Sequence, residues 1–182
     1  MESRAFIESQ VEKLRRSLER HNALCSHESE RIYHSPLDVA CISHFEKFPY
    51  DYQCFAREIG YVNLSWNGYM NLEVLRLPLR LGDLSQFSSI DEEPTWLQSE
   101  LEVRGAIGES AGKAANLCSI SDWAAQQGMD DYVLVAENPC GWTYLAYDTK
   151  ARPFSPVEIL EGEPFNSFLE YVEIYFSYSL RS

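Results

Sequence analysis

Two short segments contain the residue types from which nucleotide and metal sites are commonly built. The run from Gly105 to Lys113 is similar to a phosphate-binding loop, in which backbone N–H groups and a lysine hold a nucleotide. However, Ile107 stands where that motif needs its first glycine, and Ala114 stands where it needs a magnesium-binding hydroxyl. We therefore expect a glycine-punctuated loop here. Cys25 and His27 lack a second close pair that would complete a tetrahedral metal site.

The remaining candidates for catalysis are weaker. His44 lies on the apolar stripe of a predicted helix, where a packed core histidine is more common than a general base. Cys140 lies in a predicted turn beside Glu137, which gives its thiol no reason for a lowered pKa. Adjacent carboxylates such as Asp130 and Asp131 usually point apart, so they do not make a catalytic dyad. We expect no enzyme, no cofactor and no bound metal.

The carboxylates instead suggest a surface that binds a protein partner. We expect acids from the second half of the chain to converge around two tryptophans, since an aromatic anchor ringed by charge is typical of a binding hot spot. The candidate partner-binding residues are Asp91, Glu92, Glu93, Trp96, Glu100, Glu102, Asp130, Asp131, Glu137 and Trp142. The alternative is that both tryptophans belong to the core and the acids are dispersed over the surface.

The first third of the chain predicts three helices. Apolar residues recur at helical spacing from Phe6 to Leu18, and the helix should end near Asn22. A second helix should run to Phe48, with Ser35 as its N-cap and Pro36 in its first turn. Pro49 breaks this helix, and a third follows over 52–59, closed by Gly60 at positive φ.

The rest of the chain predicts a sheet and a closing helix. Residues 61–66 and 69–77 should pair around an Asn-Gly turn, followed by a long loop near 78–110 and a helix over 113–127. The apolar run 132–136 predicts an interior strand beside an antiparallel aromatic strand over 142–147. A short strand over 156–160 and a helix that begins at Pro164 should follow, with Phe165, Phe168, Leu169 and Val172 packed on the sheet.

Charge and composition limit the classes of partner. The chain has 182 residues, with 28 Asp and Glu against 15 Lys and Arg, and a net charge of −13. Residues 83–129 hold eight acids and two bases, and residues 130–182 hold nine acids and three bases. Such acidity disfavours nucleic acid, which needs cations, and favours a basic protein partner. The sequence shows no apolar run of membrane-spanning length and no disulfide pattern among its five cysteines. We expect a cytoplasmic protein with free thiols, Cys41 and Cys54 being buried, that is a monomer or weak homodimer.

Three blocks of sequence, taken in order, resemble the SUKH superfamily, which includes a yeast cell-wall regulator and many bacterial toxin-immunity proteins. The first is Phe48-Pro49 followed by a helix with Tyr52-x-x-Phe55 that ends in Gly60. The second is the strand pair within 132–147, and the third joins the strand at Val157 to Phe165-x-x-Phe168. The blocks cover about two thirds of the chain and leave residues 83–128 unassigned.

The resemblance implies an α+β fold, with a mixed, mainly antiparallel sheet packed against four to five helices. We expect a single domain over 1–182, in which a helix and linker (1–34) precede a SUKH-like core (35–182). The resemblance also implies a non-catalytic immunity protein that neutralises a co-produced, nuclease-type toxin domain. The alternative is a regulatory scaffold of the SUKH type that binds a signalling protein.

Overall fold

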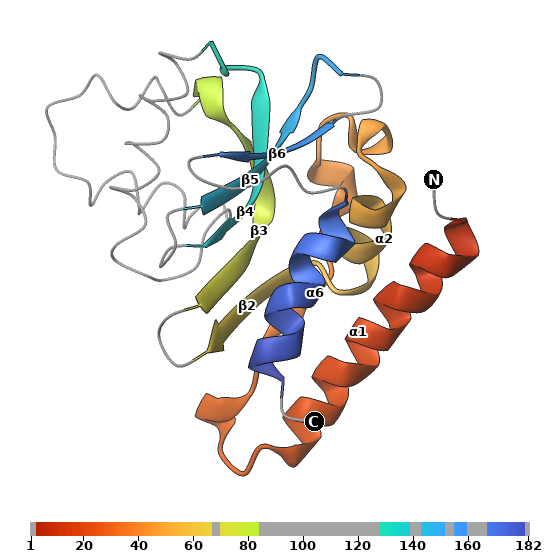
Figure 1. The fold of residues 1–182 in the computed structure, drawn as a ribbon, viewed down its shortest axis with the longest axis vertical. Helices are drawn as coiled ribbons and strands as arrows, with labels where there is room; N and C mark the ends of the chain where they lie inside the picture. Colours follow the sequence, from red (N-terminus) through yellow and green to blue (C-terminus); the bar gives the residue numbers. More distant parts are fainter. Residues whose placement is uncertain are drawn as a thin grey trace, which may run out of the picture.

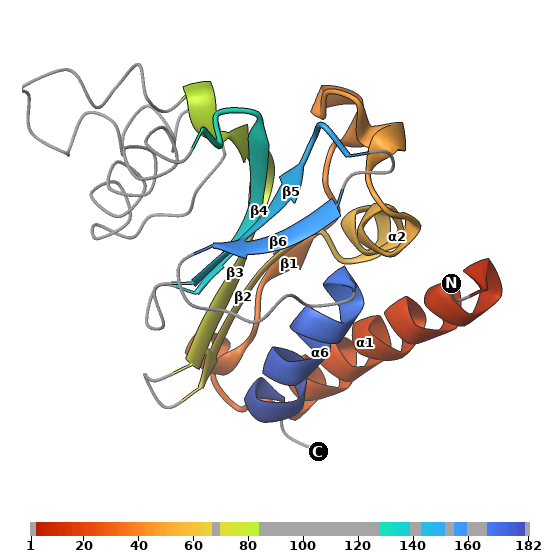
Figure 2. The same ribbon diagram turned by 45° about the horizontal axis from the view of Figure 1, so that its top comes forward.

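The computed structural model describes residues 3–66, 70–83, 128–138, 143–151, 155–159 and 167–180. It has an α+β fold, as predicted, in which helices α1 (Arg4–Leu24), α2 (Tyr50–Glu58) and α6 (Phe168–Ser179) lie on one face of a β-sheet (Figure 1). Figure 2 shows α1 and α6 side by side on this face, with α2 near the end at which both helices begin. The three helices therefore form one layer over the sheet.

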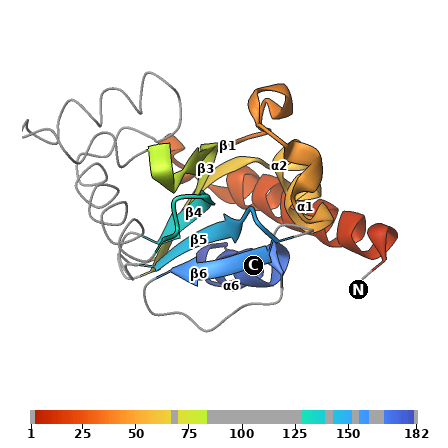
Figure 3. The same cartoon turned by 90° about the horizontal axis from the view of Figure 1, so that it is seen from above.

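The sheet has six strands that follow chain order, and every neighbouring pair is antiparallel. In Figure 3 the strands from β3 to β6 follow one another across the sheet. The strands are β1 (His34–Ser35), β2 (Tyr61–Trp66), β3 (Met70–Arg80), β4 (Tyr132–Asn138), β5 (Thr143–Asp148) and β6 (Ser155–Ile159). The predicted interior position of 132–136 is confirmed, because β4 pairs with β3 on one side and β5 on the other.

The predicted pairing of residues 61–66 with the following strand is confirmed by its register. Val62 lies opposite Val74, and Leu64 lies opposite Leu72. All four side chains are buried in the core beneath the helices, whereas Asn63, one position along, is exposed. Val62 and Leu64 thus share the core-facing side of β2, as the two-residue period of a strand requires.

The ends of α1 and α6 are fixed by serine caps. The Ser3 Oγ accepts a hydrogen bond from the Phe6 N–H at 3.2 Å, and the Ser167 Oγ accepts one from the Glu170 N–H at 3.1 Å. Each cap satisfies one of the N–H groups that a helix leaves without an internal partner. The predicted start of the last helix at Pro164 lies outside the described residues, as does Phe165.

Aromatic rings form the centre of the core between α2, α6 and β5. The centre of the Phe168 ring lies 5.0 Å from the ring centres of both Tyr52 and Phe55, and both contacts are edge-to-face. Tyr147 on β5 joins the same cluster, 5.6 Å from Tyr52. Phe55, Ile59 and Phe168 are fully buried, and Leu169 and Val172 are buried as well, which confirms these core predictions.

The predicted helix from Ser35 to Phe48 is wrong. The segment contains β1, two short 3₁₀ helices (Val39–Cys41 and Phe45–Lys47) and an intervening His44 at φ 57°. Tertiary hydrogen bonds explain the difference, because β1 pairs with β2 and the Leu37 N–H donates to the Ala56 carbonyl at 2.8 Å. These bonds use backbone groups that a helix would need. Asp38, not Ser35, supplies the capping side chain.

Gly60 has the positive φ that was predicted, 67°, and it also allows a close approach of two backbones. A Cβ atom on residue 60 would lie 2.2 Å from the Ser35 carbonyl oxygen and 2.6 Å from the Leu37 nitrogen. Residue 60 therefore closes α2 and at the same time lets the 35–37 segment lie against it.

The three described cysteines, Cys25, Cys41 and Cys54, are free thiols. Cys54 is buried, as predicted, and burial raises the pKa of its thiol. The predicted burial of Cys41 is wrong, because it lies in an exposed 3₁₀ turn where its thiol donates to Asp38 at 3.2 Å. Cys118 and Cys140 lie outside the described residues, as do Asn67-Gly68, residues 84–110 of the predicted loop and the predicted helix over 113–127. The predicted start of that loop at residue 78 is wrong, because β3 continues to Arg80.

The two glycines at positive φ give a matched test of the close approach at Gly60. Gly128 has nearly the same φ, 69°, but no atom lies within 4 Å of its added Cβ. We predict that Gly128→Ala lowers the free energy of unfolding by about 1–2 kcal/mol, the cost of the left-handed backbone. Gly60→Ala should cost more than about 3 kcal/mol, because backbone atoms must also move. Equal losses in the free energy of unfolding, measured by urea titration of the two variants, would contradict the close backbone approach at Gly60.

Phe168 should be a main contributor to stability. Phe168→Ala is predicted to lower the free energy of unfolding by about 3–5 kcal/mol, because it opens a cavity in the aromatic cluster. Ile174→Ala on the exposed side of the same helix should change it by about 0.5 kcal/mol or less. Thermal and urea unfolding of both variants would measure the difference, and similar values would place Phe168 outside the packed core.

Candidate functional site

A groove lies where the N-terminal turns of α1, α2 and α6 meet, and it encloses about 1140 Å³. In Figure 2, α2 lies between the start of α6 and the start of α1. Four separate segments of the sequence line the groove, so only folding brings its residues together. They are Arg4, Phe6, Ile7 and Gln10 from α1; Glu46, Phe48, Pro49, Tyr50, Asp51, Gln53 and Arg57 on and before α2; Tyr147 from β5; and Ser167, Phe168, Leu169, Glu170 and Glu173 from α6.

Asp51 holds two of these helix ends together. One of its carboxylate oxygens accepts from the Phe168 N–H at 2.7 Å and the Leu169 N–H at 3.4 Å, and the other accepts from the Tyr52 N–H at 2.9 Å. Asp51 is only 6 % exposed. A carboxylate is favoured at this position because both helices present their positive ends to it. The first turns of α2 and α6 therefore meet around one buried negative charge.

Aromatic side chains make up much of the groove wall. Phe48 and Phe168 are buried, while Phe6 is 45 % exposed at the rim. Two arginines that line the groove already lie over rings of this region: Arg4 is 4.8 Å from the centre of Tyr50, and Arg57 is 5.0 Å from that of Phe45. A cation over an aromatic face is attracted by the ring's negative face. The walls can therefore receive cationic as well as apolar groups.

Two tyrosine hydroxyls beneath the groove have no hydrogen-bond partner in the structure. Tyr52 and Tyr147 are both fully buried, and neither hydroxyl is within hydrogen-bond distance of a donor or acceptor. Burial raises the pKa of both side chains, and the charge of Asp51 raises that of Tyr147 further. Both therefore remain protonated at neutral pH, but only Tyr147 lines the groove.

Acidic residues outnumber basic ones around the groove. Glu46, Asp51, Glu170 and Glu173 are set against Arg4 and Arg57. The acidity continues along the exposed side of α6, where Glu170 and Glu173 precede two exposed apolar side chains. These are Ile174 (48 % exposed) and Tyr178 (51 % exposed). This α6 stripe has the combination of carboxylates and large apolar groups that is typical of a protein-binding surface.

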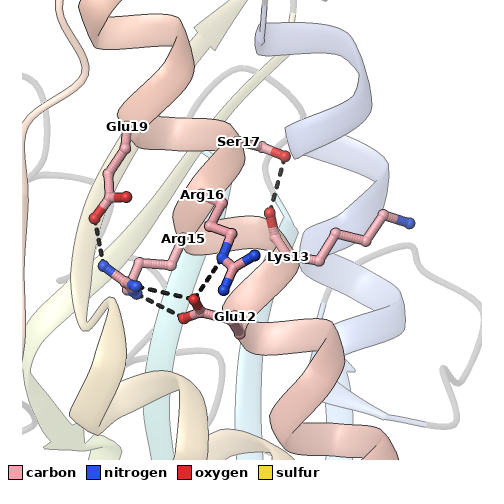
Figure 4. A network of polar contacts seen from close by, with 6 residues as sticks. All are labelled: Glu12, Lys13, Arg15, Arg16, Ser17 and Glu19. Atoms are coloured by element: carbon pink, nitrogen blue, oxygen red, sulfur yellow. Dashed lines mark hydrogen bonds and ion pairs between the residues drawn. The ribbon is translucent and has the colours of Figure 1, made fainter.

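Arg15 and Arg16, further along α1, are held by acids of the same helix (Figure 4). Glu12 binds Arg15 at 2.8 Å and Arg16 at 2.6 Å, and Arg15 also pairs with Glu19. The two hydrogen-bonded guanidinium groups lower the pKa of Glu12 to about 2. These exposed pairs stabilise the helix only modestly. Residues 12–20 of α1 hold four bases against two acids, so this part of the helix keeps a small net positive charge.

Most of the predicted partner-binding residues lie outside the described residues, namely Asp91, Glu92, Glu93, Trp96, Glu100, Glu102 and Trp142. Glu137 lies on β4, opposite Glu73 in register. Asp130 and Asp131 lie in the turn before β4, and Asp130 is exposed. Asp131 is paired within the chain, because it binds Arg80 and, at 3.2 Å, Lys150. These two cations lower its pKa.

Within the described residues, no three His, Cys, Asp or Glu side chains come together as metal ligands. In the same part of the chain, no helix has the length and apolar character to cross a bilayer.

The groove was not predicted from the sequence. Its walls come from residues 4–10, 46–57, 147 and 167–173, and no local pattern indicates that these segments meet. The α6 stripe could have been found, because Glu170, Glu173, Ile174 and Tyr178 recur at helical spacing opposite the core residues. The prediction for that helix rested on its apolar side alone.

Comparison with known proteins adds no relative. No protein-family model, curated protein or solved structure matches this chain significantly. The fold and the groove are therefore interpreted from their own chemistry.

The Asp51 carboxylate can be tested by its removal. Asp51→Ala leaves the N–H groups of Phe168, Leu169 and Tyr52 without this acceptor, and we predict a loss of about 3 kcal/mol in the free energy of unfolding. Asp38→Ala, which removes an exposed cap of a 3₁₀ helix, should cost about 1 kcal/mol or less. Urea unfolding compares the two, and equal losses would show that Asp51 is not a structural clamp.

Proposed function

We propose that this chain is a non-catalytic immunity protein of the SUKH type, which binds and neutralises a basic, nuclease-type toxin domain. The observation that carries the proposal is the charge of residues 83–182, which contain 17 acids and five bases. A nuclease needs cations to hold phosphate, so its substrate groove is a natural target for an acidic protein.

The charge excess favours fast and selective association. Complementary potentials raise the rate of encounter and disfavour partners of the same sign. The cations of this chain are too few to balance its acids, since 15 Lys and Arg stand against 28 Asp and Glu, and ion pairs such as that of Arg80 with Asp131 neutralise only some of the carboxylates. A basic partner would therefore encounter a predominantly negative surface.

The arrangement of the SUKH-like blocks supports the same proposal. The first block contains α2 and Gly60, the second contains β4 and β5, and the third contains β6 and α6. The three blocks meet at one aromatic cluster, in which Tyr52 contacts both Tyr147 and Phe168. Among the described residues, one member of each block thus packs in this cluster.

The test is binding to the toxin domain encoded by the adjacent gene. We predict a stable complex that abolishes the nuclease activity and whose association rate falls markedly as salt rises. Replacing Asp91, Glu92 and Glu93 together by Lys should weaken binding at low salt without a change in the free energy of unfolding, because surface charges contribute little to stability. Surface plasmon resonance and urea titration give the two readouts.

Controls separate this proposal from other functions. Replacing Glu12, Arg15 and Arg16 together by Gln removes a surface network while changing the net charge by only one unit, and it should leave binding unchanged. An unchanged affinity after the Asp91, Glu92 and Glu93 reversal would remove that surface from the proposal. Hydrolase or transferase activity in the purified chain would overturn it. A chain encoded without a neighbouring toxin would favour a regulatory scaffold.

A further inference from the structure

We propose that the groove between the N-terminal turns of α1, α2 and α6 is a docking site for a basic segment of a partner protein, which inserts a lysine or arginine side chain between the aromatic walls. The inference rests on the proposed function, because both assume a basic protein partner. It goes further in naming the surface and the side chain that is recognised.

The walls suit the two parts of such a side chain. Its apolar stem can pack against Phe48, Leu169 and the exposed ring of Phe6. Its charged end can lie over an aromatic face, as Arg4 and Arg57 of this chain already do at the rim. A purely apolar side chain could pack against the aromatic walls, but it would gain no electrostatic attraction from the carboxylates around them.

The balance of charge favours a cation over an anion. Helix N-termini ordinarily attract anions, but Asp51 already accepts N–H groups of both α2 and α6. Glu170 adds a second carboxylate in the first turn of α6, and Glu46 and Glu173 are exposed nearby. An anion in the groove would therefore meet four carboxylates against two guanidinium groups, in a chain with an overall charge of −13.

The floor of the groove offers a polar partner. The Tyr147 hydroxyl is buried beside the charge of Asp51 and has no hydrogen-bond partner. A buried polar group without a partner is costly, so an entering N–H donor would recover a hydrogen bond that the free protein lacks. An ammonium or guanidinium group that reaches this floor supplies such a donor.

The α6 stripe extends the docking surface beyond the groove. Ile174 and Tyr178 can contact apolar residues that flank the inserted cation in the partner. Because Glu173 lines the groove and is adjacent to Ile174, the two surfaces are continuous. This continuity favours an extended segment of a protein over a free small molecule.

The first test uses the two buried tyrosines as a matched pair. Hexalysine, hexaarginine and hexaglutamate peptides are titrated into the full chain by calorimetry at low salt. The basic peptides should bind, and Tyr147→Phe should weaken their binding about tenfold. Tyr52→Phe should bind them as the unmodified protein does, because Tyr52 is not among the residues that line the groove. Neither change should lower stability, since neither hydroxyl makes a hydrogen bond.

The second test separates the groove from general acidity. Glu170→Gln with Glu173→Gln should weaken binding of the basic peptides at least fivefold. Glu28→Gln with Glu58→Gln changes the net charge equally at exposed acids that do not line the groove, and it should have little effect. Equal effects of the two double variants, equal effects of the two tyrosine variants, or a preference for hexaglutamate would overturn the proposal.

The failure of this inference can be distinguished from failure of the proposed function. The toxin domain could bind with an affinity that does not respond to Tyr147→Phe or to the Glu170 and Glu173 changes. In that case the proposed docking site is wrong, and the proposed immunity function is retained. If the basic peptides bind through the groove but no complex forms with the toxin domain, the immunity function is wrong and the groove stands as a site for another basic partner.

Discussion

The arrangement of the helices depends on one buried carboxylate. Asp51 accepts backbone N–H groups from its own helix and from α6, which begins 117 residues later in the chain. Helix ends buried without such acceptors are unfavourable, so α2 and α6 can meet at their positive ends only because this charge lies between them. The groove follows from this constraint, since its walls are the side chains around the junction.

The core and the candidate site share residues. Phe48, Tyr147 and Phe168 pack against Tyr52 in the core, and the same three side chains line the groove. Large changes at these positions would alter stability and binding together. Changes that remove a single hydroxyl or a surface charge are therefore the informative ones.

Local sequence patterns predicted those elements that local interactions determine. The helix over 52–59, the positive φ of Gly60 and the interior strand over 132–136 each have a clear local signal, and each is present. The segment 35–48 has an equally clear helical signal but is extended and turned, because its hydrogen bonds are with Ala56 and β2. The groove has no local signal, since its four segments are brought together by the junction at Asp51.

The chain order of the strands has a consequence for how related chains can diverge. Each strand pairs with its neighbour in sequence, and the longest connection between described strands is the step from β3 to β4, residues 81–131, against residues 36–60 between β1 and β2. The entropy cost of closing a connection rises slowly with its length, by about 0.6 kcal/mol for each doubling. Insertions and deletions can therefore accumulate between these two strands while the sheet and the helix junction are retained. The acidic segment 83–129 lies almost wholly in this connection, so it can evolve towards new partners independently of the groove.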